Sequence, residues 1–170
     1  MPHEDHASVI PSRILVPIDF SASSHQALDA AAELATKFTA HVILLHVIPE
    51  YPNAVLPETV SPETLVEAER KAANERFIVS KGALDARNIA CAVIVEVGSD
   101  VASTILDVVE RENVDLLVVT THGLSGWYPQ VFGSIAEKLV KLALCPVLLL
   151  RTPKPESTAK VPFGRMMEWW

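Results

Sequence analysis

Short apolar runs alternate with longer amphipathic segments over most of this chain. Five runs are almost uniformly apolar and five to eight residues long, which is typical of strands buried on both faces. The predicted strands are residues 13–18, 41–47, 90–97, 114–119 and 146–150. Apolar residues at helical spacing follow each of the first four runs and predict helices near 22–38, 61–86, 101–111 and 135–144.

Polar residues mark the starts of three of these helices. Ser21 is placed to cap the first helix, and Ser61 followed by Pro62 is a typical cap and first turn for the second. The turn Gly98-Ser99-Asp100 ends the third strand and caps the third helix. These signals agree with the boundaries that the apolar pattern indicates.

The alternation of strand and helix predicts an α/β protein with a parallel sheet and helices on both faces. Five strands are too few for an eight-stranded barrel, so the sheet should be open and doubly wound, in a Rossmann-like arrangement. Such sheets bind ligands beyond the carboxyl ends of their strands, where the direction of the connections reverses. That edge is where functional residues are expected.

Composition narrows the choice of partners. The chain has 170 residues, of which 49% are hydrophobic, enough for one domain with a proper core. Acidic residues outnumber basic ones by 21 to 14, so nucleic acid and anionic membranes are disfavoured as partners. Cys91 and Cys145 lie in apolar surroundings and indicate reduced core thiols. The polar, acidic start is unlike a signal peptide, and no run reaches the length of a membrane span, so we expect a cytoplasmic protein.

The ends of the chain differ from its middle. Residues 1–12 are predicted to be a flexible leader, and residues 13–152 the folded domain. Residues 153–170 form a C-terminal extension whose beginning is typical of a linker.

A glycine-bearing loop is the clearest candidate for ligand chemistry. Thr120, His122 and Gly123 follow the fourth predicted strand, and Gly133-Ser134 opens the fourth helix. Backbone without bulky side chains beside a helix N-terminus suits an anion such as phosphate. A structural explanation competes, since Ser134 and Glu137 also fit the S-x-x-E capping box.

Asp19 follows the first strand, which should lie beside the fourth, so Asp19 and the glycine loop would face one crevice. Its carboxylate could accept from a ribose hydroxyl or an amino group, or it could serve only the helix start. His122 borders the crevice but has no nucleophile and carboxylate at a recognisable spacing, and His46 is interpreted as a hydrogen-bonded structural residue. The P-loop and G-x-G-x-x-G motifs are absent, which disfavours a P-loop ATPase and a Rossmann dehydrogenase.

Taken together, these segments resemble the ATP-binding branch of the universal stress protein family over about residues 13 to 151. The resemblance lies in the run from Ile14 to Ser21, in residues 42–48, in residues 115–119, in the glycine loop and in residues 145–151. The family's nucleotide-binding pattern is G-x-x-G, nine residues, then G and Ser or Thr. Gly123, residues 124–132 and Gly133-Ser134 match it, whereas Thr120 stands in place of the first glycine.

The resemblance implies an adenine nucleotide alpha hydrolase-like fold and a nucleotide site. The residues that it implies for this site are Pro17, Ile18, Asp19, Val42, Thr120, His122, Gly123, Gly133, Ser134 and Ile135. The implied ligand is ATP, with ADP and AMP as alternatives and Mg²⁺ as a companion ion. The resemblance also implies a homodimer formed through the strand from Pro146 to Leu150 and a regulatory or protective role in the stress response.

Two other functions remain open from the sequence. One is slow ATP hydrolysis assisted by His122 or Asp19, although no residue is evidently placed to activate water, so no catalytic residue is assigned. The other is a dimeric interaction module that binds no nucleotide, which Thr120 and the extension support.

Overall fold

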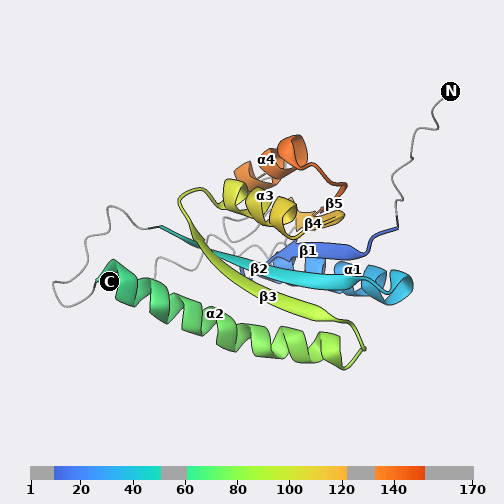
Figure 1. Cartoon of the computed structure of the whole chain (residues 1–170), viewed down its shortest axis with the longest axis horizontal. Helices are drawn as coiled ribbons and strands as arrows, with labels where there is room; N and C mark the ends of the chain where they lie inside the picture. Colours follow the sequence, from blue (N-terminus) through green and yellow to red (C-terminus); the bar gives the residue numbers. More distant parts are fainter. Residues whose placement is uncertain (1–9, 51–60, 122–132, 152–170) are drawn as a thin grey trace, which may run out of the picture.

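The computed structural model describes residues 10–50, 61–121 and 133–151 (Figure 1). Most of the predicted leader and the whole predicted extension, 153–170, lie outside these ranges. Within them, no helix is both long enough and apolar enough to span a bilayer.

All the predicted strands and helices are present, with boundaries that differ from the prediction by two residues or fewer. The strands are β1 (Arg13–Pro17), β2 (His41–Pro49), β3 (Cys91–Gly98), β4 (Leu116–Thr120) and β5 (Val147–Leu150). The helices are α1 (Ala22–Phe38), α2 (Pro62–Asp85), α3 (Val101–Arg111) and α4 (Ser134–Leu142). The apolar runs therefore located the buried strands correctly.

The strands form one parallel sheet in the order β3-β2-β1-β4-β5, as the open doubly wound arrangement predicts. The first three strands are added in one direction, and β4 then returns to the other side of β1. The connections therefore reverse direction between β1 and β4. The carboxyl ends of these two strands are therefore neighbours at one edge of the sheet.

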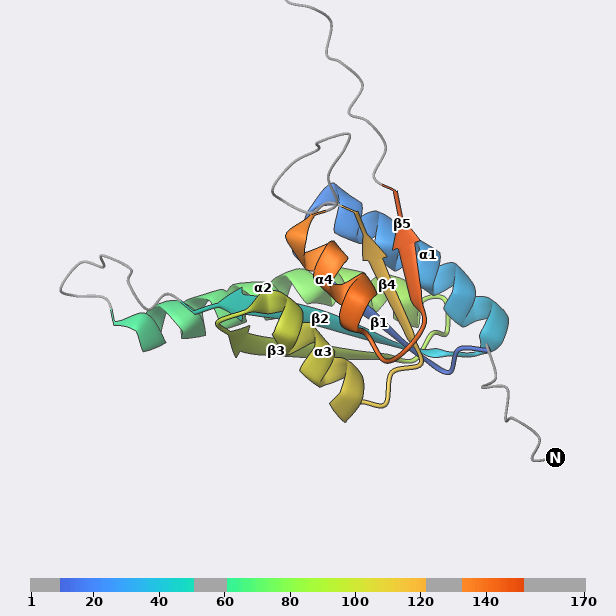
Figure 2. The same cartoon turned by 90° about the horizontal axis from the view of Figure 1, so that it is seen from above.

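Helices cover both faces of the sheet, as Figures 1 and 2 show. Ile14 and Val16 of β1 pack with buried residues of α1 and α2, whereas Leu15 packs with α3 and α4. Successive side chains of a strand point to opposite faces, so a strand covered on both sides must be apolar throughout. These three residues are fully buried, which explains why the runs showed no polar alternation.

Side-chain caps begin three of the helices as predicted. Ser21 Oγ accepts from the Ser24 N–H at 3.1 Å, and Ser61 Oγ accepts from the Thr64 N–H at 3.2 Å. At α3, the Asp100 carboxylate accepts from the Ser103 N–H at 2.6 Å. Each bond satisfies a backbone donor that the helix itself leaves unpaired.

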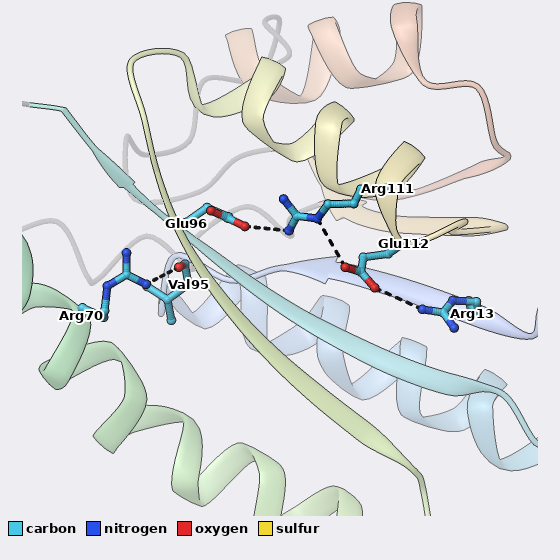
Figure 3. A network of polar contacts seen from close by, with 6 residues as sticks. All are labelled: Arg13, Arg70, Val95, Glu96, Arg111 and Glu112. Carbon is cyan, nitrogen blue, oxygen red and sulfur yellow. Dashed lines mark hydrogen bonds and ion pairs between the residues drawn. The ribbon is translucent and has the colours of Figure 1, made fainter.

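A chain of ion pairs joins α3 to the two strands on either side of β2 (Figure 3). Arg111 Nη2 lies 2.6 Å from Glu96 Oε1 of β3, and Arg111 Nε lies 3.4 Å from Glu112 Oε1. Glu112 in turn pairs with Arg13 of β1 at 3.3 Å. These side chains are partly exposed, so each pair adds little on its own, about 1 kcal/mol or less.

The outer edge of β3 is held separately by α2. Arg70 Nη1 donates to the carbonyl oxygen of Val95 at 2.5 Å, as Figure 3 shows. Since β3 is the last strand on this side, that carbonyl has no neighbouring strand to pair with. The arginine satisfies it and fixes α2 against the edge.

Candidate functional site

A cavity of about 510 Å³ lies at the carboxyl ends of β1, β2 and β4, where the connections reverse direction. Its size is within the range of small-molecule sites, and this is where doubly wound sheets bind ligands. Its described lining is Pro17, Ile18, Asp19, Ser24, Leu45, His46, Val47, Pro49, Glu69, Val101, Ile105, Val119, Thr120, Thr121, Gly133, Ser134, Ile135, Ala136 and Leu139. Seven of the ten residues predicted for the site are therefore brought together.

Three predicted residues are not among that lining. His122 and Gly123 lie outside the described residues. Val42 is described, and its place corrects the prediction. It pairs with Ile14 and Cys91 near the beginning of β2 and is fully buried in the core shared with α1 and α2.

The part of β2 that reaches the cavity is its carboxyl end. Leu45, His46, Val47 and Pro49 contribute to the lining, and the sequence interpretation did not assign them to the site. Their position in the sequence could have indicated them, because the carboxyl end of a parallel strand is the end that faces such a site.

Asp19 is fixed by the start of α1. The Ser21 N–H and Ser21 Oγ donate to Asp19 Oδ1 at 3.0 and 2.6 Å, while Ser21 Oγ also accepts the cap bond from Ser24. The carboxylate therefore supports the helix start and lines the cavity at the same time. The structural and ligand-binding interpretations of Asp19 are compatible.

Phe20, between Asp19 and Ser21, has a left-handed backbone with φ of 62°. This conformation is unfavourable for a bulky residue and costs about 1–3 kcal/mol. Its ring packs on His46 and Phe77, with centroids 4.8 and 5.0 Å away, and the Arg76 guanidinium carbon lies 4.0 Å from the ring centroid. These contacts from β2 and α2 hold the turn that positions Asp19.

His46 links the ends of two strands. Its Nδ1 lies 2.7 Å from the carbonyl oxygen of Ile18. A carbonyl can only accept, so Nδ1 carries the proton and donates, and in the neutral ring Nε2 is then an acceptor. The interpretation of His46 as a hydrogen-bonded structural residue is confirmed, and the residue also lines the cavity.

The start of α4 differs from the predicted capping box. Ser134 is the first helical residue, and the N-cap is Gly133, which has no side chain to cap the helix. The Glu137 carboxylate pairs instead with Lys141 at 2.6 Å. The prediction was wrong because S-x-x-E fits a helix that starts at Ser134 as well as one capped by it.

The uncapped start of α4 faces the cavity. Ser134, Ile135 and Ala136 all line it, and their backbone N–H groups have no acceptor within the helix. The N–H of Gly133 is already used, since it donates to the carbonyl of Thr121 at 2.9 Å. Three donors and the positive end of the helix dipole therefore border the same space as Asp19.

A polar contact fixes α4 against α3. Lys138 Nζ lies 2.8 Å from Asp100 Oδ1 and 3.0 Å from Ser103 Oγ. The hydrogen bond from Lys138 is the main reason that the pKa of Asp100 is lowered to about 2, and the Ser103 N–H adds to it. This contact sets the distance between the two helices that supply the cavity's apolar wall, which includes Val101 and Leu139.

These features define a doubly wound α/β protein with a cavity at the switch point of its sheet. A model of the universal stress protein family matches residues 11–151. The universal stress protein MJ0531 of Methanocaldococcus jannaschii is 31% identical over 144 residues, covering 85% of this chain and 84% of its own length. The chain belongs to the universal stress protein family.

Solved structures agree with this assignment. The structure of MJ0577 from the same archaeon superposes with a TM-score of 0.76 at 27% identity, covering 86% of this chain and 99% of that one. More distant family structures share the fold. One is a complex with cAMP (TM-score 0.64, 19% identity, covering 85% and 99%), and one, from Archaeoglobus fulgidus, is a complex with dAMP (0.59, 20%, 82% and 98%).

Proposed function

We propose that this protein binds an adenine nucleotide in the cavity at the carboxyl edge of its sheet. The observation that carries the proposal is the set of three N–H groups at the start of α4 that have no acceptor among the described residues and border one cavity of about 510 Å³ together with Asp19. Relatives that bind cAMP and dAMP on the same fold support it. ATP, ADP and AMP are the candidate ligands, with Mg²⁺ as a companion ion for the longer phosphates.

Different groups of the lining would contact the different parts of a nucleotide. The phosphate would accept from the Ser134, Ile135 and Ala136 N–H groups. The Asp19 carboxylate is an acceptor for ribose hydroxyls or an amino group, and apolar side chains such as Val47 and Ile105 offer a surface for the base. Among the described residues no cluster of three potential metal ligands occurs, so Mg²⁺ would be bound mainly by the nucleotide.

We infer a regulatory or stress-protective role for the bound nucleotide. We expect slow nucleotide turnover at most, because two ionisable side chains that line the cavity, His46 and Asp19, are already engaged. His46 donates to the Ile18 carbonyl, and Asp19 accepts twice from Ser21. Measured hydrolysis that falls in Asp19→Asn would instead favour an enzyme.

A pair of variants isolates the backbone donors. Ser134→Pro removes one N–H and the hydroxyl, and proline is well tolerated at the first helical position. The preceding Gly133 has ψ of 140°, which is compatible with a following proline. Ser134→Ala removes only the hydroxyl and is the matched control.

By isothermal titration calorimetry, we expect nucleotide affinity to fall about ten-fold in Ser134→Pro and two- to three-fold in Ser134→Ala. Acid extraction of the purified protein followed by mass spectrometry should also release an adenine nucleotide. An empty extract together with no binding of AMP, ADP or ATP would reject the proposal and favour an interaction module that needs no nucleotide.

We also propose that the protein is a homodimer paired through β5. This strand is at the edge of the sheet, and large apolar side chains lie exposed beside it, including Leu142 at 53% and Leu144 at 87%. The carbonyls of Pro146 and Leu150 face β4, so Leu149 presents its backbone groups outward. Light scattering should show a dimer that dissociates in Leu149→Pro and persists in Leu149→Ala.

A further inference from the structure

A strained backbone conformation lies directly beside the cavity. The described residues other than glycine that have a left-handed backbone are Phe20, Thr39, Asn88 and Asn113. Thr39 is the C-cap of α1, and the two asparagines follow the ends of α2 and α3 within three residues, where this conformation is common. Phe20 instead precedes a helix, and its bulky side chain disfavours the conformation. The strain is therefore placed next to Asp19, which lines the cavity, and strain at such a position suggests a function.

The chain on either side of Phe20 is anchored. Before it, the Ile18 carbonyl oxygen lies 2.7 Å from His46 Nδ1, which donates to it. After it, the Ser21 N–H and Oγ donate to Asp19 Oδ1 at 3.0 and 2.6 Å. A return of Phe20 to a negative φ would turn the peptide between these two anchors, and the Asp19 carboxylate would move with it. The place of Asp19 in the cavity therefore depends on the conformation of its neighbour.

The contacts that hold the Phe20 ring come from outside the cavity as well as from its wall. The ring centroid lies 4.8 Å from that of His46 and 5.0 Å from that of Phe77, which is buried in the core. On the other side, the guanidinium carbon of Arg76 lies 4.0 Å from the Phe20 centroid, at a distance typical of cation–π pairs. Arg76 is exposed on α2 and is not among the described residues that line the cavity. It contacts the ring of the turn, not the ligand space.

Two opposing effects act on this turn. The backbone strain favours a relaxed conformation, and the ring contacts favour the strained one that is observed. Their balance sets the fraction of molecules in which Asp19 has its observed position. When only part of the population is competent to bind, the apparent affinity falls in proportion to that part. A residue on the outside of α2 can in this way change the affinity of a site that it does not touch.

We infer that Phe20 and Arg76 are positioning residues for the nucleotide site. The contacts of the Phe20 ring hold a strained turn, and release of that turn moves Asp19 away from the position in which it meets the ligand. The inference rests on the proposed function and adds two residues to it, neither of which lines the cavity in the described structure.

Two substitutions of Phe20 separate strain from packing. Phe20→Leu keeps a side chain that disfavours a left-handed backbone and removes the aromatic contacts, whereas Phe20→Gly removes the contacts and the strain together. The probe is whichever of AMP, ADP and Mg²⁺-ATP binds the wild-type protein most tightly in isothermal titration calorimetry. We expect its affinity to fall at least about ten-fold in Phe20→Leu and only about three-fold in Phe20→Gly. Packing alone would give the opposite order, because glycine leaves the larger gap.

Arg76→Gln tests the remote residue, and its exposure makes a folded variant the expected outcome. We expect the affinity to fall about two- to five-fold, which is the value of a cation–π pair at an exposed site. Arg70→Gln is the matched control, because it removes the same charge from the same helix at a side chain that binds the Val95 carbonyl instead. Its affinity should equal that of the wild-type protein.

Double variants test the route of the effect. Without the ring, Arg76 has no contact through which to act on the turn, so Arg76→Gln should cause no further loss of affinity in Phe20→Gly. It should also cause none in Asp19→Ala, since the turn then has no carboxylate to position. A role of Arg76 in stability alone would lower the melting temperature equally in every background and would not show this dependence.

Several results would overturn the inference while leaving the proposed function intact. These are equal affinities of Arg76→Gln and Arg70→Gln, binding by Phe20→Leu as tight as that by Phe20→Gly, and a loss from Arg76→Gln that persists in Asp19→Ala. A wild-type protein that binds none of the three nucleotides would remove the proposed function and this inference together.

Discussion

Gly98, the last residue of β3, lies so close to α3 that a methyl group at this position would not fit. A Cβ built on Gly98 would be 2.0 Å from Thr104 Oγ1 and 3.1 Å from Thr104 Cβ. The first distance is far inside van der Waals contact, so in Gly98→Ala the Thr104 side chain must rotate or the first turn of α3 must shift. Either change also threatens the bond from Thr104 Oγ1 to the Asp100 carbonyl, which is 3.0 Å long.

The expected cost combines three effects. Overpacking of this kind destabilises by about 1–3 kcal/mol, and loss of the Thr104 hydrogen bond adds about 1 kcal/mol. The lower entropy of the unfolded chain offsets about 0.4–1 kcal/mol, since the glycine is replaced by alanine. We therefore expect Gly98→Ala to lower the free energy of unfolding by roughly 1–3 kcal/mol.

A double-mutant cycle with Thr104→Ala separates the clash from other effects. Removing Oγ1 takes away the 2.0 Å contact, so Gly98→Ala should be nearly neutral in the Thr104→Ala background. Urea unfolding of the four proteins would then give a coupling energy of about 1–3 kcal/mol between the two positions. If the losses in the free energy of unfolding of the two single variants simply add, contact with Thr104 is not what requires glycine at position 98. A Gly98→Ala variant as stable as the wild type would refute the idea in the same way.

Three further outcomes follow from the site and its surroundings. The pKa of Asp100 is lowered to about 2, mainly by Lys138. We therefore expect the difference in Tm between wild type and Asp100→Asn to be constant above about pH 4 and to disappear as the pH falls through about 2. Burial raises the pKa of the Cys91 thiol to about 11 and also raises that of Cys145, so iodoacetamide at about pH 8 should label both slowly in the native protein and fully in denaturant. Thr120 lines the cavity where the family pattern has glycine, so Thr120→Gly should tighten nucleotide binding about three- to ten-fold in calorimetry, and weaker binding would show that its hydroxyl is a ligand contact.

The sheet could be predicted from the sequence because a strand buried on both faces is a short, uniformly apolar run. Uniformly apolar runs separated by helix-forming segments fix the number of strands and their parallel direction. The adjacency of β1 and β4 follows from the few orders open to five strands, and it was sufficient to place Asp19 near the carboxyl end of β4. These predictions depend on local composition and on general rules of connection.

The predictions that failed concern positions where a local pattern allows two answers. An apolar run such as 41–47 does not show which of its residues reach the cavity. Val42 was assigned to the site, whereas the residues that line the cavity are those at the carboxyl end of β2. The S-x-x-E pattern likewise allowed a helix starting one residue later than α4 does.

Tertiary contacts explain the structural features that no sequence pattern indicates. The left-handed backbone of Phe20 contradicts the preference of a bulky residue, and it is held by rings and a guanidinium from β2 and α2. Engagement of Lys138 by Asp100 joins residues 38 positions apart in the chain. No periodicity or motif encodes such contacts, so they could be found only in the structure.

The bond between Arg70 and the Val95 carbonyl has a consequence for how copies of this protein can assemble. A parallel sheet with two open edges could add molecules at both sides and grow into a fibre. Here Arg70 of α2 occupies one outward backbone carbonyl of the β3 edge, which hinders strand pairing there. If two copies paired through β5, as proposed above, the open edge of both would be used and the assembly would end at two. Replacing Arg70 would test whether this one hydrogen bond prevents a closed dimer from growing into an open polymer.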